Sequence, residues 1–228
     1  MIDRRTFLFG AVAAAIGQPS TRLETLWEAL GYPTGQPEDV PLAAVDPLPE
    51  VEPPMAEAFR RTIATLRGAG VSIRSIDIAG MLGSLVADAR AVMFYEGARF
   101  HEERYKPYGS RLQDMASLVR EGLEIPVGRY DQARRSIEGS RARVAEIYKA
   151  TPIILVPAAP GPAPRGVDST GDSRMNAPWT ALGTPALSMP MPVAAGLPLG
   201  LQLTGDHGTD ARVIRTAVGL HHMLGRGR

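Results

Sequence analysis

Apolar residues recur at helical spacing in several parts of the chain. Met55, Phe59, Ile63 and Leu66 follow one another at intervals of three or four residues. Such positions share one face of a helix, so the pattern predicts an amphipathic helix here. Two prolines precede the run and glycines follow it, as at many helix ends. Similar patterns predict further helices over residues 21–30, 82–104, 110–121, 127–149 and 209–224.

Apolar segments without helical spacing predict the strands. Residues 152–157 form a continuous run of isoleucine, leucine and valine between two prolines, which is typical of a strand buried on both faces. β-Branched residues predict another short strand over 71–78. Two more apolar segments, 186–190 and 199–204, predict further strands. Because these strands are interspersed with helices, the expected fold class is α/β.

The first fifty residues differ from the rest in composition. Eight prolines lie between residues 19 and 54, and proline disfavours both helix interiors and sheet ladders. Apart from the short helix at 21–30, residues 21–50 are therefore expected to form a proline-rich linker or a surface arm. The α/β unit is expected over residues 51–228.

Residues 1–20 have the features of a targeting segment. Arg4 and Arg5 precede a ten-residue apolar run at 7–16, which is too short to span a bilayer as a helix. The order of charge, apolar run and small residues resembles a twin-arginine export signal; a buried N-terminal helix is the alternative. A functional signal predicts a periplasmic or other extracytoplasmic location, and its absence a cytoplasmic one. The mature chain is expected to have no membrane span.

Charge and composition exclude several classes of function. The 25 basic and 24 acidic residues give a formal net charge of +1, so no broad positive field favours a nucleic-acid partner. Cysteine is absent, which excludes disulfides, thiolate metal sites and cysteine nucleophiles. The four histidines have no metal-ligand spacing. We therefore expect neither a metal nor a cofactor.

Few residues are candidates for nucleophilic chemistry. The only lysines are Lys106 and Lys149. Lys106 precedes Ser110 by four residues, and the pair is either catalytic or a solvated loop in which Ser110 caps the next helix; we favour capping. Lys149 is expected to complement a helix dipole at its C-terminal end. Ser188 lies in a predicted strand with no base nearby, so we interpret it as a packing residue.

The segment from residue 151 onward resembles the C-terminal end of the amidase signature family. Four motifs carry the resemblance in the family's order and spacing: PAAPGPAP at 157–164, TGDSRMNAPWT at 170–180, LGTPALSMP at 182–190 and GLPLGLQLTG at 196–205. Weaker similarity extends the match to about residues 45–224. The resemblance implies a partial amidase-signature-like mixed β-sheet covered by helices, with residues 51–228 as the C-terminal part of the domain.

The resemblance also implies amide hydrolysis, and it identifies catalytic motifs that are absent from this sequence. Family members hydrolyse carboxamides, or transfer the ammonia released, with a serine nucleophile, a bridging serine in a cis peptide and a lysine. A glycine-serine-rich loop supplies their oxyanion hole. In the family these features lie N-terminal to every motif matched here, and this chain has no Gly-Gly-Ser-Ser-Gly-Gly-like run and no Ser-Ser-Gly. The expected function is therefore that of a truncated, catalytically inactive amidase with no catalytic residues to assign.

Two other functions stay open from the sequence. The chain could be a non-catalytic module that binds an amide-like ligand or completes another polypeptide, or a working amidase with unrecognised catalytic groups. Expected partners are a small carboxamide ligand and a protein that covers an exposed sheet edge. By analogy with the family's substrate cleft, Asp172 and Asn176 are the candidate substrate-binding residues. The alternative is that Asp172 closes a turn and that Asn176 caps a short helix at 177–182.

Overall fold

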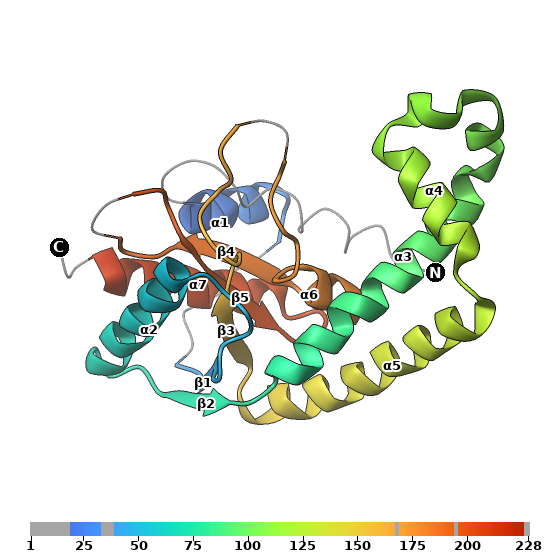
Figure 1. The fold of residues 1–228 in the computed structure, drawn as a ribbon. Helices are drawn as coiled ribbons and strands as arrows, with labels where there is room; N and C mark the ends of the chain where they lie inside the picture. Colours follow the sequence, from blue (N-terminus) through green and yellow to red (C-terminus); the bar gives the residue numbers. More distant parts are fainter. Residues whose placement is uncertain (1–18, 33–38, 167–168, 194–195, 226–228) are drawn as a thin grey trace.

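One five-stranded sheet with helices on both faces forms the body of the protein. The structure is a computed structural model that describes residues 19–32, 39–166, 169–193 and 196–225. Figure 1 shows the sheet at the centre of the body and a helical arm extending to one side. The strands are β1 (Leu42–Val45), β2 (Ile73–Ile76), β3 (Ile153–Pro157), β4 (Ala186–Pro190) and β5 (Gly200–Gly205).

Seven α-helices lie within the described residues. Each predicted helix is present, and every helix end lies within four residues of the predicted one. The helix predicted over 82–104 extends further at both ends. The helices are α1 (Pro19–Ala29), α2 (Pro53–Gly68), α3 (Ala79–Tyr108), α4 (Asp114–Glu124), α5 (Val127–Ala150), α6 (Ala177–Leu182) and α7 (Asp210–Gly225).

The sheet is mixed, as the resemblance implied. Its strand order is β2-β1-β3-β5-β4. Strand β1 runs parallel to β2 and to β3, whereas β5 is antiparallel to both β3 and β4. All five residues of β3 are buried, which confirms the prediction of a strand covered on both faces.

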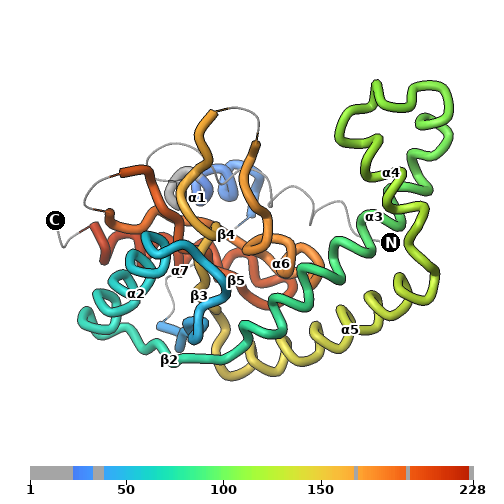
Figure 2. The backbone as a smooth tube through the Cα atoms, in the orientation of Figure 1, coloured from blue at the N-terminus to red at the C-terminus, as the bar shows by residue number. Residues whose placement is uncertain are grey.

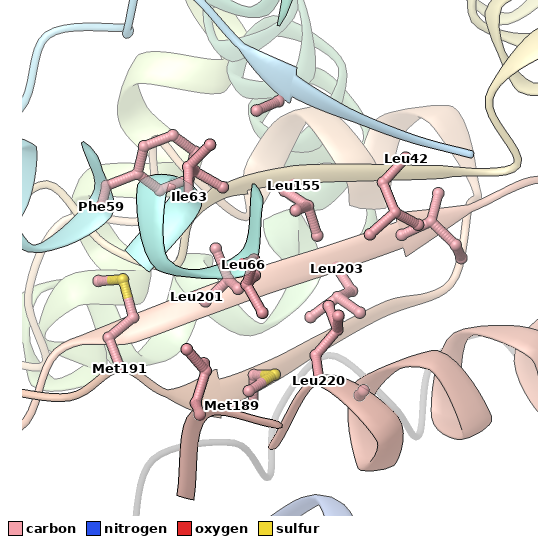
Figure 3. Close-up of a cluster of buried hydrophobic side chains, with 14 of the residues drawn as sticks. Leu42, Phe59, Ile63, Leu66, Leu155, Met189, Met191, Leu201, Leu203 and Leu220 are labelled. Atoms are coloured by element: carbon pink, nitrogen blue, oxygen red, sulfur yellow. The ribbon is translucent and has the colours of Figure 1, made fainter. Parts of the chain in front are cut away.

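Alternate residues of the strands supply two hydrophobic layers. Leu155 and Leu203 belong to the layer under α2 and α7, and Figure 3 shows these leucines between the two helices. Ile154 and Val156 belong to the opposite layer, against α3, α5 and α6. Successive residues of a strand point to opposite faces, so one short apolar segment contributes to both cores.

Helices α3, α4 and α5 form an arm that leaves the sheet, as Figure 2 shows. Helix α3 has 30 residues, which corresponds to a length of about 45 Å. The Asp88 carboxylate, which is buried, accepts an ion-pair contact of 2.8 Å from Arg129 on α5. Farther along, the rings of Tyr95 and Tyr130 stack with their centroids 4.2 Å apart. These contacts hold α3 and α5 together on the way out from the sheet.

Part of the stretch expected as a linker is an internal strand. Residues 42–45, read from the sequence as part of a proline-rich arm, form β1, and all four are buried between β2 and β3. The prolines at 41 and 47 flank this strand and lie outside it. The local proline content therefore masked a strand of four residues, which is short enough to fit between two prolines.

The expected role of Ser110 is wrong. Ser110 lies within a 3₁₀ turn, Gly109–Leu112, and the residue that precedes α4 is Gln113, which makes no side-chain cap. Pro107 lies in the last turn of α3. Because α3 continues to Tyr108, the boundary between the two helices falls later than the sequence indicated.

Among the described residues, no helix combines the length and the apolar character needed to cross a bilayer. The expected export signal, residues 1–20, lies almost wholly outside the described part of the chain.

Candidate functional site

A cleft of about 490 Å³ opens beside the C-terminal ends of β1 and β3. Its walls come from the segment after β1, the first turns of α3, the end of β3 and the segment that leads into α6. Three of its lining residues are charged: Glu50, Asp172 and Arg174. The apolar lining residues are Leu48, Pro49, Ala79, Leu82, Gly83, Val86, Val156, Met175, Pro178 and Trp179.

A buried hydrogen bond and the end of helix α6 fix the wall of the cleft that contains Trp179. The buried Gln202 amide on β5 donates to the Met175 carbonyl oxygen at 3.1 Å. Helix α6 ends at Leu182 and is followed by Gly183, whose φ of 74° is a left-handed conformation that favours glycine. Trp179 is only 1% exposed, so its indole is part of the core that underlies the cleft.

A buried hydroxyl network lies behind α6. The Tyr148 hydroxyl on α5 and the Thr204 hydroxyl on β5 are 2.8 Å apart, and Thr204 also donates to the Thr184 hydroxyl at 3.3 Å. Burial raises the pKa of Tyr148 above its ordinary value, so this phenol stays protonated at neutral pH. The network satisfies polar groups inside the core and joins α5 to β5.

Arg174 joins the two carboxylates at the charged end of the cleft. Its guanidinium lies 2.7 Å from an Asp172 carboxylate oxygen and 2.9 Å from a Glu50 carboxylate oxygen. Asp172 also accepts a 2.8 Å hydrogen bond from the Arg174 backbone N–H. These hydrogen bonds from Arg174 lower the pKa of Asp172, and the same contact raises the pKa of Arg174. Two carboxylates and one guanidinium leave this end with one net negative charge.

The contact between Asp172 and Arg174 should weaken only below the pH at which an ordinary aspartate is protonated. A carboxyl whose pKa is lowered in the folded state stabilises the protein above its unfolded pKa, which is about 4. That contribution is lost as the pH falls through the lower folded pKa. We expect the difference in unfolding free energy between the wild type and Asp172→Asn to be constant from pH 7 to about 4 and to shrink below that.

Urea denaturation at a series of pH values measures this difference. Asp39→Asn, at an exposed carboxylate outside the cleft, is the control. A difference that already shrinks between pH 6 and pH 5 would contradict the assignment.

The two expected substrate-binding residues lie in different places. Asp172 lines the cleft and, as its alternative interpretation held, closes a local turn through the Arg174 N–H. Asn176 is not a lining residue; its side-chain amide donates to the Ala158 carbonyl oxygen at 3.3 Å. Asn176 occupies the N-cap position of α6, as its alternative held, but its side chain makes no capping hydrogen bond. Substrate contact by either residue stays a prediction.

The other candidates for chemistry do not line the cleft. Lys106 lies twenty positions beyond Val86 on α3, about 30 Å along the helix axis. Its ammonium donates to Glu103 at 2.6 Å, and this hydrogen bond raises the pKa of Lys106, which opposes a role as a base. Lys149 lies in the last turn of α5, as predicted, and pairs with Glu146. Ser188 is half-buried in β4.

Two of the charged lining residues had no clear signal in the sequence. Arg174 belongs to the motif that contains Asp172, but nothing in the spacing indicated their contact. Glu50 lies in the proline-rich stretch, 124 positions from Arg174, and only the fold brings the two together. Within the described ranges, no group of three or more histidine, aspartate or glutamate side chains could hold a metal ion.

Comparison with known proteins decides the family. A family model described as Amidase matches residues 33–214. The chain belongs to the amidase signature family. This confirms the resemblance found in motifs 157–205 and extends the matched region upstream through β1.

Curated relatives and solved amidases match only part of their own length. A glutamyl-tRNA(Gln) amidotransferase subunit from Geotalea daltonii is 27% identical over 219 residues, which is 82% of this chain and 44% of the relative. The corresponding mitochondrial protein from Pyricularia oryzae is 30% identical over 114 residues, 40% of this chain and 22% of the relative. A solved structure described as an amidase superposes with a TM-score of 0.76 at 23% identity, covering 90% of this chain and 51% of the other.

The amidase-family chain thus spans about half the length of these relatives or less. The structural match supports the fold assignment, and the helices and mixed sheet agree with it.

Proposed function

We propose that this chain is an amidase-family protein that supplies part of a carboxamide-binding site and does not itself hydrolyse amides. The proposal also holds that this chain lacks the part of the domain that carries the family's catalytic residues. Family membership supports the carboxamide class of ligand, and the composition of the cleft supports the absence of turnover.

The observation that carries the proposal is the chemistry of the cleft lining. None of its described lining residues is a serine, threonine, tyrosine, histidine or lysine. A hydroxyl attacks an amide only with a base beside it and with hydrogen-bond donors placed for the developing oxyanion. The two carboxylates present, Glu50 and Asp172, are already paired with Arg174. The site therefore offers surfaces and charges that can hold an amide but no nucleophile.

An assay of the purified chain against small aliphatic and aromatic carboxamides tests the proposal. We expect ammonia release no faster than in buffer. The double variant Lys106→Ala with Ser110→Ala, which removes the one serine and lysine pair at short spacing, is the control for weak turnover. Turnover by the wild type that this variant abolishes, or an acyl adduct on any serine, would overturn the proposal.

A partner-completing module is the second candidate, and the sheet supports it. Strand β4 is the last strand of the sheet in the described chain, and an edge strand can pair with another polypeptide. On this candidate the chain alone is a well-folded monomer with one sharp melting transition. Light scattering and calorimetry measure both properties, and aggregation or a broad transition would count against the module.

We also propose that residues 1–20 direct export. Replacing both Arg4 and Arg5 with lysine should retain the chain in the cytoplasm of a bacterial host that has a twin-arginine pathway, because the pathway reads the arginine pair. Cell fractionation measures the distribution. The matched control replaces the adjacent pair Arg60 and Arg61, exposed on α2, with lysine. Cytoplasmic retention of the unmodified chain would overturn this proposal.

A further inference from the structure

We infer that the cleft selects neutral carboxamides with an apolar body and rejects ligands that carry a carboxylate. This inference rests on the proposed function, in which the cleft holds a carboxamide. It adds the ligand class, which follows from the distribution of apolar and charged groups around the cleft.

The size and lining of the cleft favour an apolar body. Its volume of about 490 Å³ lies within the usual range for small-molecule sites. Ten of the thirteen lining residues are apolar or glycine. Leu82, Val156 and Trp179 are already buried core residues, whereas Leu48, Pro49, Ala79 and Val86 are only partly buried. A ligand body that displaces water from these four partly exposed side chains gains from their burial.

The charged end explains the rejection of anions. Arg174 is the only cation among the described lining residues, and its guanidinium is held by Asp172 at 2.7 Å and Glu50 at 2.9 Å. A ligand carboxylate would have to displace one of these contacts and then lie beside two like charges. The described lining therefore has no free cation for an anionic group.

The same end can accept a carboxamide. Each carboxylate has about four acceptor positions, and the Arg174 contacts use only part of them. The NH₂ group of an amide donates hydrogen bonds and carries no charge, so it can bind these acceptors without separating the ion pairs. The cleft is then complementary to an amide head next to an apolar body.

Calorimetric titration of the whole chain with two matched compounds tests the inference. One is 4-phenylbutanamide; the other is 4-phenylbutanoate, which has a carboxylate in place of the amide on the same skeleton. We expect the neutral amide to bind at least tenfold more tightly. Equal affinity, tighter binding of the anion, or no binding of either compound by the folded chain would overturn the inference.

A cleft-filling variant locates the binding. Gly83 lines the cleft on α3, and a Cβ added there meets no atom within 4 Å. Gly83→Leu therefore places a side chain in the cleft without a clash at its first atom, and binding of the neutral amide should be lost. Gly80→Leu is the matched control, because Gly80 is on the same helix, is equally open and does not line the cleft. Equal binding by both variants would place the ligand elsewhere and overturn the inference.

A charge variant tests the cause of the selection. Replacing both Glu50 and Asp172 by their amides, Glu50→Gln with Asp172→Asn, leaves Arg174 without its anionic partners. The anionic compound should then bind more tightly than it does to the wild type, and the preference should shrink or reverse. An unchanged preference would overturn the electrostatic explanation. Ammonia release, measured separately, decides the proposed lack of turnover, so the two proposals can fail independently.

Discussion

Replacing Leu155 by alanine should lower the free energy of unfolding by about 2–5 kcal/mol, the range for a large-to-small change in a packed core. Leu155 lies in the middle of β3 and is 0% exposed. Its backbone is in register with Ala44 on one side and Leu203 on the other. Because these neighbours are held by the sheet ladder, they cannot close the cavity that the missing atoms leave.

Urea denaturation followed by circular dichroism measures the effect. The matched control is Leu197→Ala, since the Leu197 side chain is 51% exposed and should change stability by less than about 0.5 kcal/mol. If the two variants lost similar stability, β3 would not be the centre of the core.

A methyl group at Gly122 should loosen the arm. A Cβ built at Gly122 would clash with the Phe94 carbonyl oxygen and would lie 2.6 Å from the Ala98 Cβ, both on α3. These neighbours are helix backbone and a short side chain, so they cannot turn aside. We expect Gly122→Ala to destabilise the packing of α4 on α3 by about 1–3 kcal/mol, the usual cost of overpacking.

Gly139→Ala separates this clash from the general effect of alanine in a helix. Gly139 lies inside α5, and a Cβ there meets no atom within 4 Å, so the change should stabilise the chain by about 0.4–1 kcal/mol. Hydrogen exchange assigns the effect: Gly122→Ala should raise the exchange rates of α4 amides more than those of β3. Uniform loss of protection in the arm and the sheet would contradict a local clash.

The sequence predicted those elements whose residues carry their own pattern. The apolar run of β3 and the helical spacing from Met55 to Leu66 indicate burial without knowledge of any partner. Strand β1 was missed because its four residues, Leu-Ala-Ala-Val, are flanked by proline and contain a single β-branched side chain. Its burial depends on β2 and β3, and a local pattern cannot contain that information.

The candidate site, too, was predictable from the sequence only in part. Asp172 belongs to a motif and could be named from the sequence, and it does line the cleft. Its neighbour Arg174 and the distant Glu50 acquire their roles from an ion pair that spans 124 positions. Asn176, equally prominent in the motif, instead donates to Ala158. A motif therefore located the region, while the three-dimensional contacts decided which side chains reach the cleft.

The pairing of β1 with β3 affects how the chain can fold during synthesis. Leu42 is in register with Ile153, 111 positions later, and the intervening residues include the whole arm. β1 and β2 can associate early. The edge of β1 that pairs with β3 keeps its backbone groups unpaired until the ribosome has released the segment beyond residue 157. At 5–20 residues per second this interval is on the order of 5–20 s. During that time an unpaired apolar strand is available to chaperones or to other nascent chains.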